Sequence, residues 1–109
     1  MAEPVDVLQG TVDLLILKAL RLGPLHGWGI SKRVRQLSHD AFQIYQGSLY
    51  PALYRLEDKD WIDSDWGESP EGRKVRVYRL TAKGQKAFAT EQASWRAFAT
   101  TMDLVLGAE

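Results

Sequence analysis

The segment GSLYPALYRLE, residues 47–57, has the pattern of a short helix that packs against a core on one side only. The residues that recur at helical spacing are Leu49, Leu53 and Leu56. These leucines supply the packed side, because positions three and four apart share one face of a helix. Tyr50 and Tyr54 do not follow the spacing of the apolar residues, so a role other than core packing is open to them.

Pro51 sets the expected start of this helix, because proline is tolerated in the first turn and disrupts a helix interior. Ser48 is then the predicted N-cap. Two helices are predicted before it, over residues 7–22 and about 28–38. The first is apolar on more than one side, which indicates two packing partners, one of which could be another subunit. The second turns Ile30, Val34 and Leu37 inward and Lys32 and Arg35 outward.

A β-hairpin is predicted after the third helix. The segments WIDSDW (61–66) and KVRVYRL (74–80) contain β-branched and aromatic residues, and they enclose the turn-rich stretch GESPEGR. Thr81 is the predicted cap of a last helix that runs to about Leu106.

Three compact helices, a hairpin and a long helix form the order of a winged helix-turn-helix protein. The predicted fold class is therefore mainly α with a small β-hairpin and a long C-terminal dimerisation helix. Residues 1–81 would form the DNA-binding domain and residues 82–109 the dimerisation helix. In this arrangement the third helix enters the major groove of DNA and the hairpin, or wing, touches the backbone.

The outward face of the third helix carries groups that suit DNA. It begins with glycine, serine and proline, so the helix N-terminus can approach a phosphate, and its free N–H groups favour an anion. Tyrosine adds a hydroxyl for phosphates or base edges and a ring for a thymine methyl. The alternative is that Tyr50 and Tyr54 cover the hairpin or the linker instead.

The hairpin carries a cluster of basic residues just after its turn, where a wing would meet the sugar-phosphate backbone. The alternative is a solvated strand whose cations pair with the acids of the hairpin. Even in the functional reading, those acids should weaken DNA binding. The residues predicted to bind DNA are Lys32, Arg35, Ser48, Tyr50, Tyr54, Arg55, Arg73, Lys74 and Arg76.

The last helix has apolar residues at the a and d positions of a heptad, which is more apolar surface than one small subunit is expected to bury. The sequence therefore predicts a two-fold dimer, with Leu14, Phe88, Trp95, Phe98, Met102 and Val105 as dimerisation residues. Trp95 lies in the middle of the seam, where two indoles could form a slot for a planar aromatic small molecule. The alternative is a plain core tryptophan. Trp28, Trp61 and Trp66 are interpreted as structural.

The composition excludes several other classes of protein. The chain is 45% hydrophobic and 26% charged, and 14 basic residues balance 14 acidic ones, which predicts one folded domain and argues against a strongly basic, nonspecific nucleic-acid binder. It has no cysteine, two histidines, no glycine-rich phosphate loop and no metal-ligand spacing, so no enzyme, cofactor or metal is expected. It shows neither a secretory signal nor a membrane span, so a cytoplasmic protein is expected. The remaining rival is a winged-helix module that binds a protein.

Four segments together resemble the PadR family of bacterial transcriptional regulators. They are LQGTVDLLILKAL (8–20), HGWGI (26–30), GSLYPALYRLE and RVYRLTAKGQKA (76–87). The resemblance implies a winged helix-turn-helix dimer, usually a repressor of a nearby operon, that releases DNA when a ligand is sensed. The predicted dimer itself suits a palindromic operator, because paired recognition helices match two half-sites. It matches Ser48, Tyr50 and Tyr54 to the recognition helix and Arg73, Lys74 and Arg76 to the wing. It also places Trp95 where some members stack planar compounds.

One position departs from the family pattern. Asp60 stands where the family usually has a glycine before the hairpin. If the backbone φ angle is positive there, the end of the third helix is strained, although aspartate tolerates this conformation better than most residues.

Overall fold

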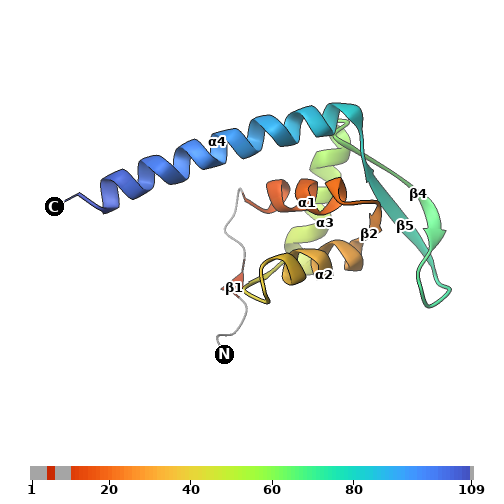
Figure 1. Cartoon of the computed structure of the whole chain (residues 1–109). Helices are drawn as coiled ribbons and strands as arrows, with labels where there is room; N and C mark the ends of the chain where they lie inside the picture. The colour runs from red at the N-terminus through yellow and green to blue at the C-terminus, as the bar shows by residue number, and fades with distance from the viewer. Residues whose placement is uncertain (1–4, 7–10, 109) are drawn as a thin grey trace.

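The computed structural model describes residues 5–6 and 11–108. In this part of the chain the helices are α1 (Val12–Arg21), α2 (Gly27–Leu37), α3 (Gln46–Asp58) and α4 (Ala82–Leu106). The strands are β1 (Val5–Asp6), β2 (Leu25–His26), β3 (Phe42–Gln43), β4 (Ile62–Glu68) and β5 (Lys74–Leu80). The mainly α class with a β-hairpin is confirmed (Figure 1).

Helix α1 is the centre of the core. It contacts α2, α3, α4 and β5, which explains why its buried residues Ile16, Leu17, Ala19 and Leu20 occupy more than one side. The leucines of α3 and Ile30 of α2 close the same cluster. The wide apolar surface predicted for the first helix is thus used largely inside one protomer.

Two helix starts differ from the predictions. Helix α1 begins at Val12, and residues 7–10 of the predicted helix lie outside the described residues. Helix α3 begins at Gln46 with Tyr45 as its N-cap, so the prediction of Ser48 as N-cap is wrong. The reason is that Pro51 is accepted inside the helix, where it removes a bond to the carbonyl of Gly47. Gly47 is exposed, so water can hydrate that carbonyl.

The hairpin is part of a larger sheet. Strand β5 pairs with β4 along its whole length and with β2 on its other edge, in the order β2-β5-β4. The two-residue strand β2 was not predicted, because a strand this short has no period to recognise. Its pairing of His26 with Val77 brings the start of α2 beside β5.

The end of α3 shows the strained conformation anticipated at Asp60, whose φ is 61°. The N–H of Trp61 donates to the carbonyl of Leu56 (3.1 Å), and the N–H of Asp60 donates to that of Glu57 (2.9 Å). This is the Schellman arrangement, in which glycine is favoured at the left-handed position. Aspartate accepts it here at a cost of roughly 1 kcal/mol relative to glycine.

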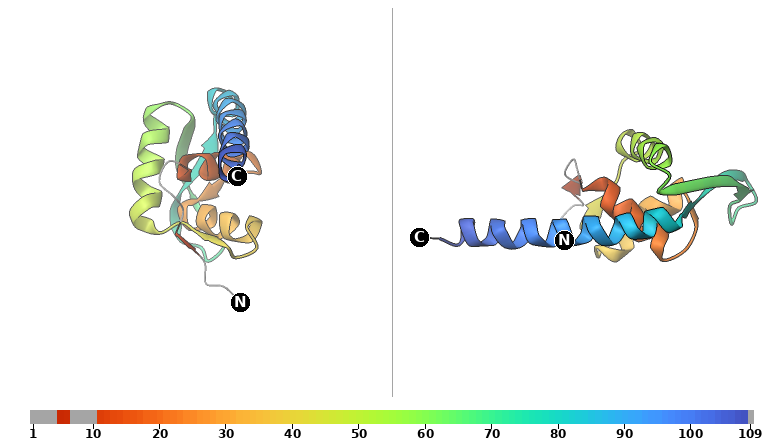
Figure 2. Two further views of the ribbon diagram at one scale, coloured as in Figure 1. Left: turned by 90° about the vertical axis from the view of Figure 1, so that its left-hand side faces the viewer. Right: turned by 90° about the horizontal axis from the view of Figure 1, so that it is seen from above.

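Helix α4 is anchored at its start and projects from the body along most of its length (Figure 1). Thr81 caps it as predicted, because its Oγ1 accepts the N–H of Gly84 at 2.9 Å. Gly84 and Phe88 are the buried residues of α4. The free end of α4 and the hairpin lie on opposite sides of the body (Figure 2).

Three apolar side chains are more exposed than predicted. Leu37 was expected to face the core but is half exposed, because α2 ends at this residue. Trp28 and Trp66 were interpreted as structural, yet 62% and 58% of their surfaces are exposed. Neither indole belongs to the hydrophobic core. Trp61 does pack against that core, as predicted.

Candidate nucleic-acid interface

Helix α3 presents its tyrosines to solvent. Tyr54 is 68% exposed, and Tyr50 is exposed to a smaller degree. The hydroxyl of Tyr50 lies so close to Gly27 that a Cβ added there would be 3.0 Å from it. Tyr50 therefore leans on the start of α2 while keeping an open face. The alternative in which the hairpin or linker covers both rings is not what the structure shows.

Two of the predicted DNA-binding cations are engaged with acids. Arg55 donates to Asp13 at 2.7 Å, and this hydrogen bond raises the pKa of the Arg55 guanidinium. Arg35 donates to Asp40 at 3.3 Å and to the side chain of Gln43 at 3.2 Å. Since a neighbouring carboxylate offsets the charge offered to a phosphate, these arginines are poorer phosphate ligands than the sequence predicts.

The wing turn is held by its own backbone. The Ser69 N–H donates to the carbonyl of Arg73 (2.8 Å), and the Arg73 N–H donates to the Ser69 hydroxyl (3.1 Å). Gly72 has a φ of 80°, a conformation that glycine adopts without strain. Arg73 therefore projects from a hydrogen-bonded turn and is exposed.

Trp66 forms a platform with two wing cations. Lys74 Nζ lies 4.9 Å and the Arg76 guanidinium 5.3 Å from the centre of the indole. Because side chains paired across antiparallel strands share a face, Trp66, Arg76 and Lys74 lie on the face that also carries buried Tyr78. The ring holds the two cations on this face through cation–π attraction.

The alternative reading of the wing, in which acids neutralise its cations, applies to one pair in the described residues. Arg79 donates to Asp63 at 3.1 Å, and both side chains are exposed. No carboxylate of residues 11–108 lies within ion-pair distance of Arg73, Lys74 or Arg76. These three remain the candidate phosphate ligands of the wing.

A chain of hydrogen bonds joins the wing to the recognition helix. Arg76 Nε donates to the Ser64 hydroxyl at 2.8 Å, and that hydroxyl donates to the carboxylate of Glu57 on α3 at 3.2 Å. Beside it, burial raises the pKa of the Tyr78 phenol, which therefore stays neutral. Arg76 is thus positioned by α3 as well as by its own strand.

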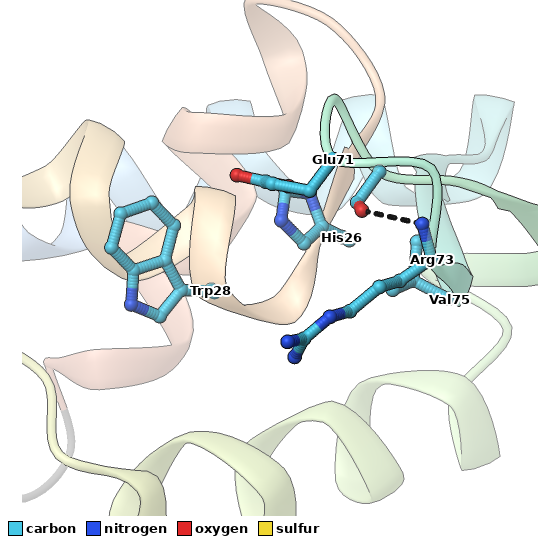
Figure 3. A pocket seen from close by; sticks show the side chains of 6 residues that line it. His26, Trp28, Glu71, Arg73 and Val75 are labelled. Atoms are coloured by element: carbon cyan, nitrogen blue, oxygen red, sulfur yellow. Dashed lines mark hydrogen bonds between the residues drawn. The ribbon is translucent and has the colours of Figure 1, made fainter.

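A cleft of about 410 Å³ lies between the start of α2 and the wing turn (Figure 3). It is lined by His26, Trp28, Ser69, Glu71, Arg73 and Val75. Sequence reasoning missed both Trp28 and Trp66 as surface groups. For Trp28 a local signal was present, because Lys32 lies one helical turn away and 5.1 Å from the ring centre. The cations beside Trp66 belong to the neighbouring strand β5, so their proximity depends on the strand register.

The second half of α4 carries an uncovered apolar seam. Phe98 is 63% exposed, and Trp95, Met102 and Val105 are also exposed. The prediction of Phe88 as a dimerisation residue is wrong for the protomer as folded, because Phe88 is buried in its own core with the Arg21 guanidinium 5.4 Å from its ring centre. Leu14 is half buried against that same core. Leu104 and Leu106 are further exposed apolar residues that the heptad pattern did not include.

Other site types find no support in the part of the chain that the structure describes. Its His, Asp and Glu side chains form no group of three that could hold a metal ion. None of its helices combines the length and apolar character needed to cross a membrane.

The fold and this surface define a winged-helix DNA-binding protein. Residues 16–90 match the model of the PadR-like family of transcriptional regulators. The chain belongs to this family. Members are transcriptional regulators, so the expectation that the protein is not an enzyme is confirmed.

Individual relatives agree with this assignment. The chain is 31% identical over 84 residues to a transcriptional regulator of Mycobacterium tuberculosis, Rv3488, covering 77% of this chain and 75% of the relative. A solved transcriptional regulator from Clostridium thermocellum is 30% identical with a TM-score of 0.78, over 87% of this chain and 92% of that one. A PadR-like regulator from Bacillus cereus is 25% identical with a TM-score of 0.76, over 93% and 96%.

Proposed function

We propose that this DNA-binding transcriptional regulator is a homodimeric, ligand-responsive repressor of a palindromic operator. The observation that carries the proposal is the pairing of an exposed, tyrosine-bearing α3 with an uncovered apolar seam on α4. Residues 1–81 act on DNA and residues 82–109 dimerise, although the first turns of α4 also complete the core of the protomer. A regulator of this kind acts in the compartment that holds the chromosome, the bacterial cytoplasm.

A dimer is supported by the extent of the seam. Aromatic, methionine and aliphatic side chains are exposed over several turns of α4, and soluble monomers rarely leave so large an apolar surface in water. A two-fold axis along this seam repeats α3 and the wing on the partner, which suits two half-sites related by the same symmetry. Such a dimer can block transcription by occupying the operator, and reporter transcription with and without the protein tests this direction of regulation.

Trp95 is the residue that we propose for ligand contact. Its indole is half exposed within the seam, so a two-fold axis can bring a second copy near it. In a variant that keeps Trp95 and replaces Trp28, Trp61 and Trp66 by phenylalanine, a planar cationic dye should quench the indole fluorescence. Emission that does not change at saturating dye would leave Trp95 as a plain interface residue.

DNA binding is expected to depend strongly on salt. Lys32, Arg73, Lys74 and Arg76 offer up to eight phosphate contacts per dimer, so log affinity should fall against log salt with a slope of roughly −4 to −7. Tyr54→Ala should weaken operator binding about five- to thirtyfold, because it removes a contact of about 1 to 2 kcal/mol. Fluorescence anisotropy with an operator selected from random DNA measures both quantities.

Lys86→Ala is the matched control for these measurements, since Lys86 is an exposed cation on α4, which starts at the end of β5 away from the wing turn. It should leave affinity and slope unchanged. A slope of zero for the wild-type protein would favour the rival function, a winged-helix module that binds another protein through the same face.

A further inference from the structure

The cleft between α2 and the wing is built from two segments that lie far apart in the sequence. One comprises His26 and Trp28, and the other runs from Ser69 to Val75. The pairing of β2 with β5 brings these segments together, and the bonds between Ser69 and Arg73 fix the far wall. In Figure 3 the Trp28 indole and the Arg73 side chain border the same open space.

The walls of the cleft have complementary chemistry. Trp28 supplies a large exposed apolar surface and an indole N–H, and Lys32 adds a cation 5.1 Å from its ring centre. Arg73 supplies an exposed guanidinium that forms no ion pair with a carboxylate of residues 11–108, although its charge attracts the nearby Glu71 carboxylate. An apolar wall beside a cationic wall matches the alternation of deoxyribose and phosphate along a DNA strand.

The position of the cleft fits a DNA strand as well. Tyr50 on α3 lies close to Gly27, the residue before Trp28, so the exposed face of α3 is adjacent to one wall of the cleft. When a helix lies in the major groove and a wing lies against the neighbouring backbone, a strand must cross the gap between them. The cleft lies between the start of α2 and the wing turn, where such a strand would pass.

Glu71 is the one lining group that opposes such a ligand. Hydrogen bonds from its own backbone N–H and from Ser69 lower the pKa of the Glu71 carboxyl, so the side chain stays ionised at neutral pH. A carboxylate in the cleft repels a phosphate and should reduce affinity. Removing the charge of Glu71 should therefore raise the affinity for DNA, whereas removing the charge of Arg73 should lower it.

We propose that this cleft seats one phosphodiester of the operator backbone, with Arg73 paired to the phosphate, Trp28 packed on the adjoining sugar and Glu71 limiting the affinity. The proposal rests on the proposed DNA-binding function and adds Trp28 and Glu71 to the residues that set its strength.

The test compares four variants of the full-length protein by operator titration at several salt concentrations. Trp28→Ala should weaken binding about tenfold without changing the salt slope, because the indole carries no charge. Trp28→Phe should retain most of the affinity. Glu71→Gln should strengthen binding about three- to tenfold. Arg73→Gln should weaken binding and make the slope less steep by about 2 per dimer.

Asp103→Asn is the matched control for Glu71→Gln, because it removes one negative charge from an exposed position. Asp103 lies on the last turns of α4, outside the wing and the cleft. The proposal is overturned if Asp103→Asn strengthens binding as much as Glu71→Gln, or if Trp28→Ala binds like wild type. It is equally overturned if Trp28→Ala and Trp28→Phe lower the melting temperature and weaken binding to the same extent, because the loss of affinity would then follow from lost stability. Wild-type binding with a steep salt slope alongside any of these results would leave the proposed function standing.

Discussion

Gly84→Ala is expected to lower the free energy of unfolding by about 3 kcal/mol or more, which is a large fraction of the stability of a small domain. A Cβ atom at this position would lie 1.9 Å from the carbonyl oxygen of Trp61 and 2.9 Å from a methyl of Leu80. Hydrogen bonds hold both Gly84 and the Trp61 carbonyl in place. The Gly84 N–H donates to the Thr81 hydroxyl, and that hydroxyl donates to the carbonyl of Asp60. The Thr81 N–H donates to the Trp61 carbonyl at 3.0 Å.

The expected loss is a net value, because alanine by itself favours the helix over glycine by about 1 kcal/mol and the clash must exceed that gain in stability. Thermal unfolding followed by circular dichroism should show a melting temperature lower by roughly 10 to 20 °C. Gly47→Ala is the control, because a Cβ there meets nothing within 4 Å and the residue is exposed in α3. It should raise stability slightly. Equal melting temperatures for Gly84→Ala and wild type would mean that α4 is not packed on the hairpin as described.

The double variant Phe98→Glu with Val105→Glu is expected to be a monomer that has lost more than a hundredfold in operator affinity. Both side chains are largely exposed in the protomer, so the core is left intact. In a two-fold dimer the substitutions place four carboxylates in an apolar seam, where an unpaired charge is costly. A monomer also loses the high effective concentration with which the second half-site is bound.

Sedimentation equilibrium gives the oligomeric state, and anisotropy with whole and half operators gives the affinities. Thr100→Glu is the control, because a residue two positions from Phe98 lies on the other side of an α-helix. It should remain dimeric. A dimeric double variant with normal operator affinity would move the subunit interface away from this face of α4.

Much of the fold could be predicted because local signals and packing agree. Residues close together in the sequence determine the leucine spacing of α3, the turn between β4 and β5 and the cap at Thr81. The possibility of a left-handed residue at Asp60 came from the resemblance, because the family usually has a glycine there, and the φ of 61° agrees with it.

The rest depended on contacts that no local pattern encodes. The heptad of α4 groups Phe88 with Phe98, yet α1 of the same protomer covers Phe88 and leaves Phe98 in water. Spacing identifies an apolar stripe but does not say which surface covers it. Likewise, Trp28 and Trp66 are apolar by type, and their place on the candidate DNA interface follows from strand pairing across the sheet.

The hydrogen-bonded line from Glu57 through Ser64 to Arg76 limits how this protein can respond to a signal. Because these hydrogen bonds join the hairpin to α3, we expect helix α3 and the wing of one protomer to move together as a unit. A signal that controls transcription would then change the angle between the two protomers of the proposed dimer, which meet at α4. The internal arrangement of each protomer would stay constant.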